Sequence, residues 1–222
     1  MVGAAYGYWG VTQQSMSLET ALLATGLCSV SGMLPDLDSD SGIPLRETSM
    51  FVAAVAPMLM IDRFQDLGLS HESMALGALM VYLLVRFVLV EIFRRHTVHR
   101  GMWHSLPAAG IAGVGAYLLM PCPAESIRVY KTLAVVLGFL THLMMDEIWS
   151  IDFARLRLKR SFGTALKFFG NDWTSNIVVY AQLAGLMYLA WGDHDIADRL
   201  RDRVRLQDRY IAQPTEPMDR WR

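Results

Sequence analysis

Carboxylate and imidazole side chains occur in three short polar segments of an otherwise apolar chain. The segments are 35–38 (Pro-Asp-Leu-Asp), 99–105 (His-Arg-Gly-Met-Trp-His-Ser) and 142–146 (His-Leu-Met-Met-Asp). Burying an ionisable group in hydrocarbon costs several kcal/mol unless the group is paired or bound to a cation. Because all three segments supply the same two ligand types, we predict one shared metal site.

The third segment has the spacing of a ligand pair on a helix. His142 and Asp146 are four residues apart, which places them on one helical face with Cβ atoms about 5–6 Å apart. An imidazole and a carboxylate in that arrangement can bind the same ion. The alternative is a His–Asp hydrogen bond within a pair of packed helices.

The first segment places acidic residues at alternate positions. Asp36 and Asp38 follow Pro35, which ends or bends the preceding apolar segment, and Asp40 extends the pattern. The alternative is a polar turn that caps a helix, where aspartate is common. Counted from Asp36, Gly42 falls at the seventh position instead of the sixth, where an EF-hand needs its glycine, which argues against a calcium loop of that type.

The second segment carries two histidines that a turn could bring together. His99 and His104 are five apart, and Gly101 between them favours a turn. Arg100 can hold a carboxylate or phosphate oxygen in a bidentate fork. Ser105 is expected to cap a helix that starts at the next residue. The alternative is a solvated interfacial cluster, with the neighbouring tryptophan at the lipid headgroups.

The chain around these segments has the composition of a membrane protein. Of its 222 residues, 53% are hydrophobic and 18% are charged, and the mean hydropathy is +0.29. A soluble domain is about 45–50% apolar and about 25% charged. The net charge of −1 predicts no nucleic-acid partner. Cys28 and Cys122 have no CxxC spacing, so neither a zinc ribbon nor a redox motif is supported.

Six apolar segments connect the polar ones and predict an all-α fold. The segment 74–93 is about 20 residues long, enough to cross a hydrocarbon core of about 30 Å. The segment 50–61 is short and contains Pro57, so a re-entrant, interfacial or buried helix is the alternative to a span. No strand-like alternation or repeat is present. We therefore expect an integral membrane bundle of about five or six helices; the remaining segments are 18–34, 106–120, 132–149 and 176–191.

Counting these segments across a bilayer places the three polar segments on one face, provided that the segment 50–61 spans the membrane; if it is re-entrant, the first polar segment falls on the other face unless another segment compensates. Basic residues at 94–95 and 155–160 assign that side of the membrane to the cytoplasm. We expect a membrane-embedded domain over residues 1–192 that holds the metal site, and a charged tail over residues 193–222. If all six segments span, the tail lies on the opposite side, which conflicts with its arginines, so its side stays open.

The order of the motifs resembles the YdjM-like family of inner-membrane metal-dependent hydrolases. The match covers Ala21 to Trp149, and the most specific part is His99-Arg100-Gly101-x-x-His104-Ser105. It is preceded by Pro35-Asp36-Leu37-Asp38 and followed by Gly138-x-x-Thr141-His142-x-x-x-Asp146. The resemblance implies a multi-pass protein of the cell inner membrane with a metal-dependent hydrolase activity.

Two positions depart from that family pattern. Ser39 stands where members usually carry a histidine after the Asp-x-Asp pair. Members also usually carry a histidine before a Gly/Ala-rich segment near the N-terminus, and residues 2–7 resemble that segment without its histidine. Either the chain begins upstream of Met1 or a ligand has been lost, and both departures concern the completeness of the metal centre.

The residues together predict a metal centre that activates water. The expected ligands of one or two divalent cations are Asp36, Asp38, His104, His142 and Asp146, with Zn first and Mn or Fe as alternatives for mixed N/O ligation. A bound cation lowers the pKa of water toward about 7. Asp38 or His99 is the expected general base, with His99 also placed as a ligand or behind one. Arg100 is expected to stabilise negative charge on a phosphoryl or carbonyl oxygen.

The expected substrate is a lipid or other amphiphile that carries a phosphoester or another ester, because the site lies at a membrane face. Two other classes of protein remain open. The same Asp/His cluster could form the ion pathway of a small transporter, which would place its ligands near mid-membrane and show repeat symmetry. A non-catalytic membrane scaffold, with the tail as the recruiting segment, is the other alternative.

Overall fold

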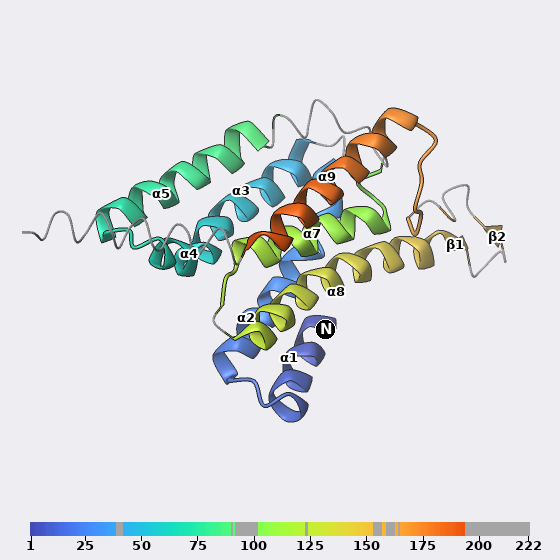
Figure 1. Cartoon of the computed structure of the whole chain (residues 1–222). Coiled ribbons are helices and arrows are strands. Elements are labelled where there is room, and N and C mark those ends of the chain that lie inside the picture. The colour runs from blue at the N-terminus through green and yellow to red at the C-terminus, as the bar shows by residue number, and fades with distance from the viewer. Residues whose placement is uncertain are drawn as a thin grey trace, which may run out of the picture.

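A computed structural model describes residues 1–38, 42–89, 91, 102–122, 124–152, 157–158, 163 and 165–193, and Figure 1 shows their arrangement. The described chain is almost entirely helical. Its helices are α1 (Val2–Gln13), α2 (Leu18–Ser31), α3 (Gly42–Leu59), α4 (Ile61–Asp66), α5 (His71–Leu83), α7 (Leu106–Leu119), α8 (Glu125–Trp149) and α9 (Trp173–Trp191). A 3₁₀ turn, η1 (Pro35–Asp38), follows α2, and a π-helical segment, η2 (Leu84–Leu89), continues α5.

The predicted helical class is confirmed for the described residues, with two differences. A short antiparallel pair, β1 (Ile151–Asp152) and β2 (Arg157–Leu158), follows α8. The segment expected at 50–61 is the second half of the longer helix α3, in which Pro57 lies near the C-terminal end, where a missing N–H interrupts little of the helix. Helices α1 and α4 were not expected from the sequence.

The centre of the fold is the packing of α8 against α2 (Figure 1). Gly138 makes this approach possible, because a Cβ atom there would overlap the carbonyl oxygen of Cys28 and the hydroxyl of Ser31. Only glycine lets two helix backbones come this close. The hydrophobic core at this contact includes the buried side chains of Ala24, Leu27, Ala134 and Val135.

Helix α1 packs on both α2 and α8. Gly3 and Gly7 lie against the backbone of α2 around Ala21 and Thr25. Tyr6 and Tyr130 stack with ring centroids 4.7 Å apart, and each hydroxyl donates a hydrogen bond to the other residue's carbonyl, at 3.0 and 3.1 Å. These contacts fasten the N-terminus of the chain to the first half of α8.

A second core cluster lies where α7 meets the end of α8. Ala108 and Ala109 pack against Phe139, Leu143 and Ala165, and α7 in turn contacts α9. Helix α7 begins where the sequence predicted, since the hydroxyl of Ser105 accepts a hydrogen bond from the backbone N–H of Ala108. Small residues on α7 let it approach α8 and bring residues 102–105 to the same end of the bundle as the last turns of α8.

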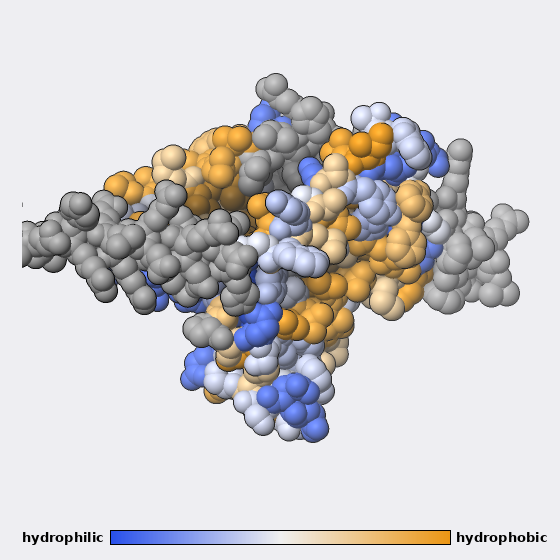
Figure 2. All heavy atoms as spheres, in the orientation of Figure 1, coloured by the Kyte–Doolittle hydropathy of each residue, from blue (hydrophilic) through white to orange (hydrophobic). Residues whose placement is uncertain are grey.

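Two helical stretches, His71–Val88 and Glu125–Trp149, are long and apolar enough to cross a membrane among the described residues. None of the first stretch is buried within the protein, whereas nearly half of the second is. Figure 2 shows the consequence as a continuous apolar surface over α5. Helices α2 and α7 are apolar but shorter, so the structure supports two of the five or six expected spans by length and composition.

A buried ion-pair network holds the N-terminal end of α8. The guanidinium of Arg128 lies 2.5 Å from one carboxylate oxygen of Asp193, and that of Arg63 lies 2.9 Å from the other. The same two arginines donate to the carbonyls of Tyr117 and Leu118 at the end of α7. The network therefore ties α4, α7, α8 and the end of α9 together and satisfies carbonyls that a helix terminus leaves open.

Candidate metal centre

Helix α8 supplies two of the candidate ligands just beyond its close approach to α2. His142 lies one turn after Gly138, and its Nδ1 atom is 2.6 Å from the carbonyl oxygen of Gly32, the residue that caps α2. A carbonyl only accepts, so Nδ1 carries the proton and donates it. The other ring nitrogen, Nε2, is therefore left with its lone pair available, which is the tautomer that metal-binding histidines use.

The Nε2 atom of His142 is buried and has no hydrogen-bond partner within the described part of the chain. Leaving a buried acceptor unsatisfied costs about 1–3 kcal/mol. A folded protein tolerates such an atom where a bound water molecule or ion satisfies it. Of all the features of these residues, this unsatisfied acceptor is the one that best fits a bound metal ion.

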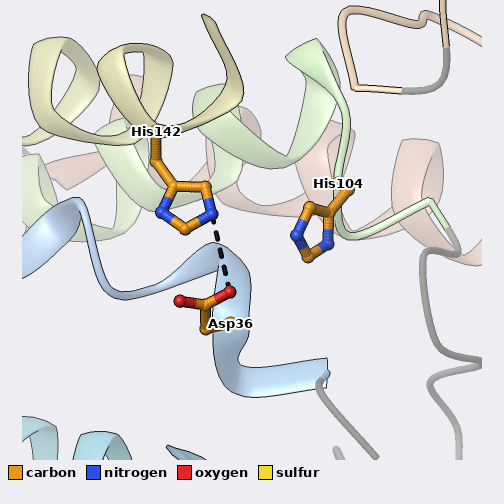
Figure 3. Close-up of side chains that lie close together, drawn as sticks. All are labelled: Asp36, His104 and His142. Atoms are coloured by element: carbon orange, nitrogen blue, oxygen red, sulfur yellow. Dashed lines mark ion pairs between the residues drawn. The ribbon is translucent and has the colours of Figure 1, made fainter. Parts of the chain in front are cut away.

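Three further ligand atoms lie around that nitrogen. Asp36 Oδ1 and Asp146 Oδ2 are each 3.5 Å from His142 Nε2, and Asp146 Oδ2 is 3.7 Å from His104 Nε2. Ligands bound at about 2.1 Å in a tetrahedral site are about 3.4 Å from one another. Asp36, His104 and His142 have ligand atoms within 4.8 Å of one another and could together hold a metal ion. Figure 3 shows these three side chains turned toward a common point from three separate segments.

The four side chains differ in burial, so the site has a buried side and an exposed side. The imidazoles of His104 and His142 are 8% and 17% exposed, whereas the carboxylates of Asp36 and Asp146 are 49% and 43% exposed. The histidines therefore form the inner wall, and the carboxylates form an open rim. A site of this shape leaves one side accessible to water or a substrate, as catalytic metal sites do.

The residue before His104 fixes the segment that carries it. The indole N–H of Trp103 donates a hydrogen bond of 2.9 Å to the carbonyl oxygen of Leu34, two residues before Asp36. Its ring meets the edge of Phe139 on α8. On the other side, the hydroxyl of Ser105 caps α7. His104 is therefore held between a helix start and a bond to the turn that carries Asp36.

The structure brings together four of the five predicted metal ligands: Asp36, His104, His142 and Asp146. The backbone of Asp38 completes the turn η1, but its side chain lies outside the described atoms. His99, Arg100 and Ser39 also lie outside the described residues. Residues 2–7, the segment without its expected histidine, form the first half of α1 and pack on α2.

Three features of the centre were not predicted from the sequence. They are the Gly32 carbonyl, the Trp103 indole and the Glu147 carboxylate, which accepts hydrogen bonds from the backbone N–H groups of Gly163 and Ala165. Glu147 thereby ties the segment after the β pair to the last turn of α8. Each of these contacts joins residues distant in the sequence, so the only signal was that Trp103 and Glu147 stand directly beside a predicted ligand.

Comparison with known proteins adds one finding. A family model described as YdjM inner membrane protein matches residues 1–192, which includes every residue of the candidate centre. No curated protein and no solved structure matches the chain. The match confirms the family resemblance that the order of the three polar segments indicated.

Proposed function

This chain belongs to the YdjM inner membrane protein family, and we propose that it is a membrane-bound, metal-dependent hydrolase. The observation that carries the proposal is the buried Nε2 atom of His142, which has no hydrogen-bond partner among the described residues, while the Gly32 carbonyl orients the ring through Nδ1. Carboxylates of Asp36 and Asp146 and the imidazole of His104 lie at ligand spacing around it.

The donor set suits a divalent cation of the first transition row. Two imidazoles and two carboxylates provide mixed N/O ligation, for which Zn is our first expectation and Mn or Fe are the alternatives. Asp38 is a further proposed ligand or general base, since it follows Asp36 in the same turn. When bound, such an ion supplies Lewis-acid activation of water and of the bond to be cleaved.

The chain's own residues supply orientation and charge. His142 is oriented by Gly32, and the carboxylate of Asp146 faces both imidazoles through Oδ2, where it would complete the ligand set. His99 is proposed as a general base and Arg100 as the group that stabilises negative charge on the reacting oxygen. These roles would give hydrolysis of a phosphoester or another ester.

The surroundings of the site support an amphiphilic substrate. Asp146 lies in the last turns of α8, where the neighbouring apolar side chains face outward: Met144, Met145, Ile148 and Trp149. Exposed apolar groups beside a polar centre mark a contact with a membrane or an apolar ligand. An ester headgroup could reach the carboxylate rim while its acyl or prenyl chain stays along these residues. The two candidate spans, His71–Val88 and Glu125–Trp149, and the family match support a multi-pass location in the inner membrane.

Metal content is the first test. The protein purified in detergent and supplied with Zn, Mn and Fe should hold about one or two ions per chain by elemental analysis, since the proposed site binds one or two. Asp36→Ala and His142→Ala should lose them, whereas His71→Ala, which alters an exposed histidine at the start of α5, should not. A wild-type protein without stoichiometric metal would contradict the proposal.

Turnover is the second test. The metal-loaded protein should release product from at least one amphiphilic phosphoester or carboxylic ester in a panel presented in mixed micelles, and Asp36→Ala should abolish release. Metal that is retained without hydrolysis would favour the scaffold. Metal that moves across the membrane of proteoliposomes would favour the transporter.

A further inference from the structure

We infer that Trp103 is a positioning residue of the metal centre: its indole N–H, bonded to the Leu34 carbonyl, holds His104 at ligand distance from the acidic turn that carries Asp36. The inference rests on the proposed metal site and assigns a role to a residue that is not itself a ligand.

The two imidazoles are oriented in different ways. His142 lies in the middle of a turn of α8 and has its own bond to the backbone of Gly32. His104 lies in an irregular segment, one residue before the cap of α7. The position of a side chain on such a segment is only as well defined as the position of its backbone. A metal ligand on that segment therefore needs a separate contact that fixes the backbone.

Trp103 provides that contact from the adjacent position. Its Nε1–H lies 2.9 Å from the oxygen of Leu34, and its ring packs edge-on against Phe139 with centroids 6.1 Å apart. The hydrogen bond joins the segment of His104 to the turn of Asp36, and the ring contact joins both to α8. The hydrogen bonds of Trp103 and His142 are accepted by carbonyls of the same short stretch, residues 32–34. The positions of both histidines are therefore fixed relative to the same backbone segment.

The alternative is that Trp103 only fills the core beside Phe139. The two roles depend on different atoms, because packing needs the ring, whereas positioning needs the indole N–H. Trp103→Phe keeps an aromatic ring and removes the donor. Trp173→Phe is the matched control, since Trp173 is exposed at the start of α9, outside the residues that form the centre.

The experiment compares Zn²⁺ or Co²⁺ affinity with the thermal midpoint in detergent. Trp103→Phe should weaken affinity roughly tenfold, the lower end of the effect expected when a contact that orients a ligand is lost. Its thermal midpoint should stay close to that of Trp173→Phe. Unchanged metal affinity in Trp103→Phe would overturn the inference.

Two measurements on the metal-free protein separate this inference from the metal site itself. The His104 imidazole resonance, assigned with His104→Asn, should shift or broaden in Trp103→Phe, whereas the His142 resonance should not. In the wild type, the indole proton of Trp103 should exchange slowly with solvent. A wild type that binds no metal but shows both results would refute the metal site and leave the positioning role standing. A fast-exchanging indole proton or an unaltered His104 resonance would refute the positioning role.

Discussion

The imidazole of His142 donates a hydrogen bond from Nδ1 to the carbonyl oxygen of Gly32, 110 residues earlier in the chain. This bond joins the middle of α8 to the end of α2 and determines which nitrogen of the ring faces the acidic residues. Helix packing and ligand chemistry therefore depend on the same contact.

The tautomer of His142 should be observable directly. In metal-free protein, ¹⁵N spectra of the imidazoles should show a proton on Nδ1 of His142, because Gly32 offers only an acceptor. Addition of Zn²⁺ should move the Nε2 resonance and leave the Nδ1 proton in place. A His142 ring without a proton on Nδ1 would contradict the geometry.

Gly138→Ala should damage both stability and metal binding. The added Cβ would overlap the backbone of Cys28, which cannot move as a flexible side chain can. Overpacking of this kind costs about 1–3 kcal/mol or more. Because His142 lies one turn further along α8, metal affinity should fall as well. Gly26→Ala on α2 is the control, since nothing lies within 4 Å of the new Cβ, and it should be neutral or stabilising by up to about 1 kcal/mol.

Asp193→Asn should destabilise the far end of the bundle. It removes the negative charge between Arg128, which is almost fully buried, and Arg63. Loss of one partner of a buried ion pair costs about 3–5 kcal/mol, because the remaining charge stays buried without compensation. Denaturation in mixed detergent should report the loss. Asp62→Asn changes an exposed carboxylate on α4 and should cost less than about 1 kcal/mol.

The N-terminal end of α9 should become less stable at low pH, because its capping residue is an aspartate, Asp172. Hydrogen bonds from the hydroxyl and backbone N–H of Ser175 lower the pKa of Asp172 below its ordinary value. A carboxyl group with a lowered pKa in the folded state stabilises that state above the unfolded pKa of about 3.9, and the contribution is lost as pH falls through the lowered value. Ser175→Ala should raise the Asp172 pKa in an NMR titration. An unchanged titration midpoint would show that the cap does not supply this stabilisation.

Local spacing predicted the features of the centre that lie within one element. The i,i+4 spacing of His142 and Asp146 placed both on one face of α8, and their ligand atoms are 3.5 Å apart. Ser105 marked the start of α7, because a serine hydroxyl satisfies the first free N–H groups of a helix. These features depend on helix geometry alone, so the residue types and their separation were sufficient.

Helix boundaries were predicted less accurately where tertiary packing stabilises the helix. Helix α1 was missed because its glycines are poor helix formers alone and become favourable only when they lie against α2. Helix α8 begins at Glu125 rather than at the predicted Thr132. The buried Arg128 and Lys131 in its first turns read as a polar boundary in the sequence. In the fold, Arg128 is neutralised by Asp193.

Residue identity and spacing were sufficient to predict the candidate ligand types, their order along the chain and the family. Which atoms meet depends on how the helices pack. The close approach at Gly138 sets where α8 crosses α2, and that crossing places His142 beside Gly32 and Asp36. Trp103 then connects the segment of His104 to the same turn. Such contacts join residues about 70 and 110 positions apart, so no local pattern encodes them, and the energy of backbone packing decides them.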